Sequence, residues 1–287
     1  MPTDRWRELC KLVAQDDGLP VWKEAHQGTK EKLFFWYRYL TITTNAMWHN
    51  RHFPGGLVYV DLFAGSGVCA TKDSKHRFPG STLIAANMPK PFARIVACEQ
   101  NQLLARACEA RLNKTKVAAR CRVLHGDCNR LVDEIVRDIP RRALTLAFID
   151  PTGLDPKFAT IAKLSEGRAV DFVTLFADAY DIIRNAEYHY RNDPNSKLDE
   201  VLGPDSRWRE KLDKLRNPTG INRRNLFAEI YKSQLQRHLG YRHFNHHTIC
   251  RKGTPLYRLI YASRHQLGLH FWKEALKRDV SGQRELF

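Results

Sequence analysis

A glycine-bearing turn follows a short apolar run near residue 60. The run Val58-Tyr-Val-Asp61 leads into Leu62-Phe-Ala-Gly-Ser-Gly67. Glycines after a strand let the backbone approach a ligand closely, and amides at the next helix start can receive a carboxylate. The acid Asp61 could hold an ammonium group or orient a water molecule. A dinucleotide site would need the third glycine of G-x-G-x-x-G, so the turn favours another nucleoside cofactor; the alternative is an ordinary tight turn.

Acidic residues also end the next two apolar runs. Glu99 follows Arg94-Ile-Val-Ala-Cys98, where an acid commonly accepts both ribose hydroxyls, and Asp127 stands where it could accept an adenine amine. A single acid after a strand is commonly a solvated loop residue or a helix cap. Three at successive strand ends point at one crevice. The predicted cofactor-binding residues are Asp61, Phe63, Ala64, Gly65, Gly67, Glu99, Gln100, Asp127 and Cys128.

A fourth motif, Phe148-Ile-Asp-Pro-Thr-Gly153, carries the predicted acceptor site. Proline holds the residue before it extended, so Asp150 is presented rigidly. Base-amino methyltransferases place Asp/Asn-Pro-Pro-aromatic here, and the acid or amide accepts hydrogen bonds from the target amine. Thr152 and Gly153 replace the second proline and the aromatic residue. A stacking ring must therefore come from elsewhere, such as Phe158 or Tyr180; alternatively, Asp150-Pro151 only ends a strand.

Other polar residues cluster near the same predicted crevice. Asp178, after the fifth apolar run, could assist the target or cap a helix. The predicted catalytic residues are Asp150, Pro151 and Asp178, and the predicted substrate-binding residues are Thr152, Tyr180, Arg184, Asn185, Arg223 and Arg224. Solvated surface arginine is the alternative for the basic members. No metal is predicted, because the histidines between 243 and 247 lack carboxylate or cysteine partners.

Alternating strands and helices must position these residues. The strands are expected at 57–61, 94–98, 121–124, 144–149 and 169–176, with helices between them. This spacing predicts an α/β fold, a doubly wound Rossmann-like and mainly parallel sheet. Two runs at 241–250 and 256–262 are too close for a crossover helix, so they predict a C-terminal antiparallel hairpin.

The chain is predicted to divide into four parts. Residues 1–54 form an N-terminal helical extension, and residues 55–181 form the Rossmann-like cofactor-binding core. A helical basic insertion follows at 182–238, and residues 239–287 add the hairpin and a helix that complete the core.

The amino-acid composition indicates which binding partners and which cellular compartment to expect. The 287 residues carry 47 Lys and Arg against 31 Asp and Glu, a formal net charge of +16, which suits a polyanion such as nucleic acid. The alternative is a basic protein kept soluble by its charge. The seven cysteines include no C-x-x-C pair, and no apolar run approaches the ~20 residues of a membrane span. We therefore expect a cytoplasmic protein without membrane contact.

Several segments together resemble one known family. The D-L-F-A-G-S-G turn, Pro79-Gly-Ser-Thr-Leu-Ile84, the F-I-D-P-T-G-L run ending at Leu154, Ile183-Arg-Asn185 and Pro255-Leu-Tyr-Arg-Leu-Ile-Tyr-Ala-Ser263 are similar to the three-Cys-motif partner (TcmP) family. The resemblance spans about residues 30–275. It implies a Rossmann-like methyltransferase fold and a second protein partner that carries the three-Cys motif. The Asp-Pro-x-Gly run also resembles the motif of tRNA N2,N2-dimethylguanosine methyltransferases.

Together these features predict an S-adenosylmethionine-dependent methyltransferase. It would act on nucleic acid, on a base amino group, with RNA slightly favoured over DNA. The alternative is a catalytically inactive subunit on the same fold, either binding nucleic acid or working with a three-Cys-motif protein. The missing aromatic residue after Asp150 favours this alternative.

Overall fold

The structure is a computed structural model that describes residues 2–25, 27–72, 76–178, 182, 185–216, 219–251 and 253–278. The expected apolar runs form its central strands. These are β2 (Leu57–Asp61), β5 (Arg94–Glu99), β6 (Cys121–His125), β7 (Leu144–Ile149) and β8 (Ala169–Phe176). The C-terminal hairpin is β9 (His243–Arg251) and β10 (Thr254–Ser263).

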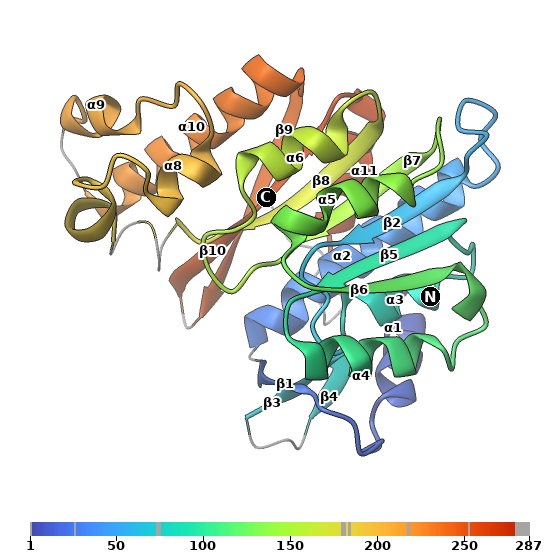
Figure 1. Cartoon of the computed structure of the whole chain (residues 1–287). Helices are drawn as coiled ribbons and strands as arrows, with labels where there is room; N and C mark the ends of the chain where they lie inside the picture. The colour runs from blue at the N-terminus through green and yellow to red at the C-terminus, as the bar shows by residue number, and fades with distance from the viewer. Residues whose placement is uncertain are drawn as a thin grey trace.

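One sheet gathers these strands in the order β6-β5-β2-β7-β8-β10-β9. The first five run parallel, whereas β10 is antiparallel to both β8 and β9. The predicted Rossmann-like α/β fold with a hairpin at one edge is therefore confirmed (Figure 1). The first strand of this sheet along the chain is β2, which lies in its middle. The chain passes from β2 to β5 and β6 on one side and then returns to β7 and β8 on the other, so the direction of winding reverses between β2 and β7.

Both faces of the sheet are buried, as continuous apolar strands require. Side chains alternate along a strand, so Leu57 and Tyr59 of β2 enter one core while Val58 and Val60 enter the other. In Figure 1, α5 and α6 lie in front of the sheet, and α2, α3 and α11 lie behind it. The first group belongs to the core that contains Val58, and the second to the core that contains Tyr59.

Helices connect and cover the strands. They are α1 (Pro2–Leu12), α2 (Gln27–Met47), α3 (Ser81–Ala86), α4 (Gln102–Leu112), α5 (Cys128–Arg137), α6 (Phe158–Ser165) and α11 (Gln266–Leu276), with a 3-10 turn η1 (Ala118–Arg120). The aromatic stretch of α2 explains its central place, because Phe34, Phe35, Trp36 and Tyr37 are all buried. Among the described helices, none is long and apolar enough to cross a membrane.

A second, smaller sheet was not expected from the sequence. It has the order β1-β3-β4 and consists of β1 (Trp22–Ala25), β3 (Val68–Thr71) and β4 (Arg77–Pro79). The strand β1 pairs in parallel with β3, which directly follows the glycine turn. The N-terminal extension is therefore not purely helical, and it reaches the turn that we expected to hold the cofactor.

In its described residues, the segment predicted as a basic insertion is largely helical. Its helical elements are the π-helix η3 (Ala186–Tyr190), α8 (Lys197–Leu202), α9 (Trp208–Asp213) and α10 (Gly220–Leu239). Both α8 and α10 contact α6, so the segment extends the layer in front of the sheet (Figure 1). The end of α10 lies one residue beyond the predicted boundary at 238.

Candidate functional site

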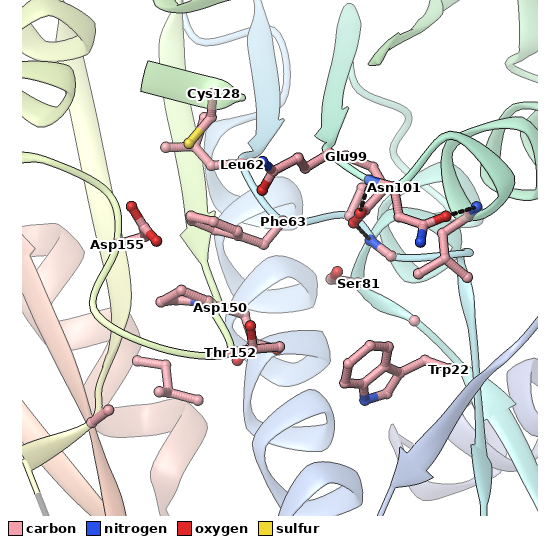
Figure 2. Close-up of a pocket in the computed structure, with 18 of the residues that line it drawn as sticks. Trp22, Leu62, Phe63, Ser81, Glu99, Asn101, Cys128, Asp150, Thr152 and Asp155 are labelled. Carbon is pink, nitrogen blue, oxygen red and sulfur yellow. Dashed lines mark hydrogen bonds between the residues drawn. The ribbon is translucent and has the colours of Figure 1, made fainter. Parts of the chain in front are cut away.

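A cavity of about 930 Å³ opens at the carboxyl ends of β2, β5, β6 and β7. This is where doubly wound sheets bind ligands, because the strand order reverses there and the loops diverge. Figure 2 shows residues of four strand ends facing this space: Phe63 after β2, Glu99 on β5, Cys128 after β6 and Asp150 after β7. The N-terminal strand β1 contributes Trp22 from the other side.

Most of the predicted site residues line this cavity. They are Phe63, Ala64, Gly65, Gly67, Glu99, Gln100, Asp127, Cys128, Asp150, Pro151 and Thr152. Two predicted substrate-binding residues, Tyr180 and Arg184, lie outside the described residues. The remaining five, Asp61, Asp178, Asn185, Arg223 and Arg224, are not among the residues that line it.

The glycine turn is open toward the cavity. Gly65 and Gly67 have φ angles of 57° and 78°, in the left-handed region that side chains other than glycine rarely adopt. A Cβ atom on Gly65 would meet no other atom within 4 Å, so a side chain there would project into unfilled space. The backbone N–H of Gly65 donates to Glu99 Oε2 at 2.8 Å, and that of Asn101 donates to Oε1 at 2.7 Å. Glu99 thereby ties two loops together at the cavity wall (Figure 2).

Asp61 departs from its expected position on the wall. Its side chain is fully buried and accepts hydrogen bonds from the Ser81 hydroxyl at 2.5 Å, the Tyr59 hydroxyl at 2.9 Å and the Phe63 N–H at 3.2 Å. Burial raises the pKa of Asp61 to about 6, although these three donors each lower it. Asp61 therefore fixes the turn from beneath, and Ser81 is the member of this network that lines the cavity.

Asp127 lies at the adjoining end of the cavity, at the start of α5. Its Oδ1 accepts from the backbone N–H of Asn129 at 2.8 Å and from the Asn129 side-chain amide at 3.0 Å. The Asn129 side-chain oxygen accepts in turn from the Lys157 N–H and the Thr160 hydroxyl. Asn129, which sequence reasoning missed, thus joins the β6–α5 turn to the start of α6 and lines the cavity itself.

Asp150 is paired with a lysine that sequence reasoning also missed. Lys32 Nζ, near the start of α2, lies 2.6 Å from Asp150 Oδ1 and 2.5 Å from Oδ2. The lysine is 6% exposed, whereas 21% of the Asp150 side chain remains accessible from the cavity side. Burial alone would lower the pKa of Lys32, but the charge and hydrogen bonds of Asp150 raise it above the ordinary value. The lysine therefore stays positive at neutral pH, and it neutralises the carboxylate.

The expected roles of Asp178 and Arg224 do not agree with their positions. Asp178 is fully buried, with Arg224 Nη2 3.1 Å from its Oδ1 and Arg258 Nε 2.7 Å from its Oδ2. Burial raises the pKa of Asp178, while both arginines lower it. This cluster joins β8, α10 and β10 inside the protein, so Asp178 and Arg224 support the frame and do not face the cavity. Asn185 and Arg223 also stand away from its wall.

The aromatic residues at the cavity differ from those expected. Phe158 is buried and packs edge-on against His238, so it cannot stack on a ligand. The rings that line the cavity are Trp22, Phe63 and Tyr257. Tyr257 faces Lys32 Nζ at 5.4 Å and its hydroxyl donates to the Gly28 carbonyl at 3.3 Å.

Three further basic side chains lie along the cavity: Lys157, Lys197 and Arg251. They come from the loop before α6, from α8 and from the end of β9, which are far apart in the sequence. Lys157 is paired with Glu200 at 2.5 Å. Within the described residues, no group of three His, Cys, Asp or Glu side chains is placed to hold a metal ion.

Comparison with known proteins adds evidence on the fold. No family model and no curated protein matches the chain. The solved structure of LPL1258 from Legionella pneumophila is similar with a TM-score of 0.53 at 12% identity, covering 88% of this chain and 93% of that one. An O-methyltransferase from Bacillus cereus in complex with SAH gives 0.45 at 9% identity, covering 91% of this chain and 99% of that one. The first likeness supports the shared fold alone.

Proposed function

We propose that this protein is an S-adenosylmethionine-dependent methyltransferase that acts on nucleic acid, at a base amino group. One observation carries the proposal: a single cavity joins a glycine turn, Glu99 and Asp127 to a carboxylate, Asp150, that is held in place by a buried lysine. The first three fit a nucleoside cofactor, and Asp150 fits a hydrogen-bonding acceptor amine. Cofactor and acceptor could therefore meet inside one enclosed space, as group transfer requires.

The residues present fit the cofactor. The open space at Gly65 leaves room for its amino-acid end, Glu99 could accept its ribose hydroxyls, and Asp127 could accept its adenine amine. When bound, the cofactor supplies a methyl group on a positively charged sulfur. Trapping the acceptor in line with that methyl group is then the main task of the protein, because the donor is already activated.

Asp150 would orient the acceptor. A carboxylate has about four lone-pair sites, and Lys32 occupies one on each oxygen, so acceptor capacity remains on the exposed side. An amine N–H donating to Asp150 keeps its nitrogen lone pair directed toward the methyl group. An amine nitrogen that accepts a methyl group would also have to lose a proton, and Asp150 would be the residue that receives it.

Charge supports a nucleic-acid substrate. The chain has a formal net charge of +16, and Lys157, Lys197 and Arg251 line the cavity itself. Lysine and arginine at a cavity opening bind backbone phosphates and release condensed counterions. We favour RNA slightly over DNA.

Two further points belong to the same proposal. One is membership in the TcmP family, with a three-Cys-motif protein as partner. The other is a cytoplasmic location, which agrees with seven cysteines that are all free.

A second candidate is an inactive subunit on this fold. Its support is that both Asp150 oxygens already bond Lys32, and that Thr152 and Gly153 follow Pro151 where an aromatic residue would stack on a base. Such a subunit would bind nucleic acid or a three-Cys-motif protein without transferring a methyl group.

Two measurements separate these candidates. Calorimetry with S-adenosylmethionine and its demethylated product should show binding to the folded wild-type protein. Incubation with labelled methyl donor and total RNA or total DNA should then label the nucleic acid, RNA more than DNA. Cofactor binding without labelling of either would favour the inactive subunit, and no cofactor binding would refute the methyltransferase proposal.

A further inference from the structure

Of the three rings that line the cavity, Phe63 packs against the core on one face of the sheet and Tyr257 faces the Lys32 ammonium group, which leaves Trp22. Its indole is partly exposed, lines the cavity and lies across from Thr152 and Asp150 in Figure 2. In the part of the chain that the structure describes, no ring or cation contact involves it. Tyr257, by contrast, already faces the Lys32 ammonium group. A partly exposed indole on the wall of a cavity leaves part of its apolar face in water, which a flat ligand could cover.

A buried arginine holds the segment that carries Trp22. Arg111 of α4 is 4% exposed, and its Nε and Nη2 lie 2.8 and 2.7 Å from the two oxygens of Asp17. Its Nη1 donates to the Pro20 carbonyl at 2.8 Å and to the Ser66 carbonyl at 2.7 Å. The hydrogen bonds from Arg111 lower the pKa of Asp17 to about 2, so this pair stays charged at neutral pH. The N-terminal segment is thereby fastened to the glycine turn.

Strand pairing then places Trp22 at the acceptor end of the cavity. Trp22 is the partner of Cys69 in the parallel pair β1–β3. Cys69, Lys32 and Asp150 line the same cavity. In Figure 2 Trp22 and Thr152 lie in the lower part of the view, whereas Cys128 lies in the upper part, where we expect the adenine.

We propose that Trp22 is the stacking surface for the acceptor, and that the acceptor is a planar nucleobase turned into the cavity. This inference rests on the proposed function and supplies the ring that the Asp150 motif lacks. Stacking on an indole tolerates any base, because every base has a flat face, while Asp150 selects for an exposed amino group. Lys197 and Arg251, which line the same cavity, can bind the flanking phosphates. Trp22 is thus a specificity-determining residue for a base rather than for a sugar or a protein side chain.

Substitutions at Trp22 test the proposal in the full-length protein. Trp22→Ala removes the ring, Trp22→Phe keeps a smaller one, and Trp48→Ala is the matched control. Trp48 is 38% exposed, lies under Lys90 Nζ at 4.1 Å and does not line the cavity. The probes are single-stranded RNA and DNA oligonucleotides of mixed sequence, and the same strands with abasic residues, measured by fluorescence anisotropy.

The base-containing strands should bind Trp22→Ala about tenfold more weakly than wild type. The abasic strands should bind both proteins equally, Trp22→Phe should recover most of the affinity, and Trp48→Ala should match wild type. Cofactor affinity by calorimetry should stay unchanged in all variants. Equal loss for base-containing and abasic strands, no loss, or a loss of cofactor affinity in Trp22→Ala would overturn this role. Failure of the wild-type protein to bind any strand would also overturn it. The methyltransferase proposal is tested separately, because it fails if the wild-type protein does not bind the cofactor.

Discussion

The Lys32–Asp150 ion pair allows the sharpest test of the site. Lys32 is nearly inaccessible, and both carboxylate oxygens lie within 2.6 Å of its ammonium nitrogen. Removing one partner of a buried pair costs about 3–5 kcal/mol of unfolding free energy, because the other charge is left uncompensated. Asp150 keeps a fifth of its side chain exposed, so water can partly solvate it after the loss of Lys32. We therefore expect Lys32→Met to cost about 3 kcal/mol, at the lower end.

A double-mutant cycle isolates the pair from other effects of the substitutions. Lys32→Met with Asp150→Asn removes both charges, so we expect the double variant to cost only about 1–2 kcal/mol. Each single variant leaves one charge uncompensated and should cost about 3 kcal/mol, so the coupling should be about 4–5 kcal/mol. The control pair is Lys277–Glu274, whose side chains are 57% and 36% exposed. Its coupling should stay below about 0.5 kcal/mol, as for other exposed pairs on a helix.

Urea unfolding at neutral pH measures all the variants. A coupling at Lys32 and Asp150 no larger than that of the control would refute the buried pair. The same variants report on function, since Lys32→Met should reduce methyl transfer while leaving cofactor affinity close to that of wild type. If Lys32→Met lost cofactor affinity instead, Lys32 would belong to the cofactor end of the cavity and not to the acceptor end.

Three further predictions concern substitutions of Glu99, Asp150 and Asp61. Glu99→Ala should weaken cofactor binding by calorimetry by about 1–3 kcal/mol, because ribose hydroxyls lose their acceptor, and unchanged affinity would remove Glu99 from the site. Asp150→Ala should abolish methyl transfer in the labelled-methyl assay with cofactor affinity preserved, while Asp150→Asn retains more activity; full activity of folded Asp150→Ala would contradict the mechanism. Asp61 has a pKa raised to about 6 in the folded state, so the folded protein binds this proton more tightly than the unfolded chain. Its contribution to stability is therefore greatest below about pH 4 and falls by about 2–3 kcal/mol as the pH rises to 6. Urea unfolding should show this fall as the difference between the pH profiles of wild type and Asp61→Asn, and superimposable profiles would contradict it.

The central sheet was predictable because its strands are marked in the sequence itself. Buried parallel strands read as continuous apolar runs, and β2, β7 and β8 begin and end at the predicted residues. The hairpin followed from the short spacing between its two runs. The smaller β1-β3-β4 sheet has no such pattern in the sequence. Its strand β1 has only four residues and is formed by pairing with β3, the strand that follows the glycine turn.

The residues that the N-terminal extension contributes to the cavity could not be inferred from the sequence, because they reach it only through contacts with distant parts of the chain. Lys32 precedes Asp150 by 118 residues. Trp22 reaches the cavity through the pairing of β1 with β3 and the ion pair between Arg111 and Asp17. The one available signal was a lysine directly before the aromatic stretch of α2, where a charged side chain would need a buried partner. Sequence alone does not say which acid provides it.

Burial divides the strand-end acids in a way that the sequence does not record. Asp61 and Asp178 both follow apolar strands, yet neither has any exposed surface. Each meets donors from a different element: Asp61 meets the Ser81 hydroxyl of α3, and Asp178 meets the guanidinium groups of Arg224 and Arg258. Both carboxylates are thus bound to groups inside the protein, which explains why two acids with the expected spacing are absent from the cavity wall.

Glu99 and Asp127 show the opposite arrangement, and this difference identifies them as ligand-binding candidates. The hydrogen bonds to Glu99 come from the Gly65 and Asn101 N–H groups, and those to Asp127 come from Asn129, all within the loops that form the wall. Backbone and neighbouring amide donors orient a carboxylate without using all of its lone pairs. Both side chains therefore stand fixed on the cavity wall with acceptor capacity left over. A nucleoside, which offers hydroxyl and amine donors at its two ends, matches the two acids in chemistry and in order along the sheet.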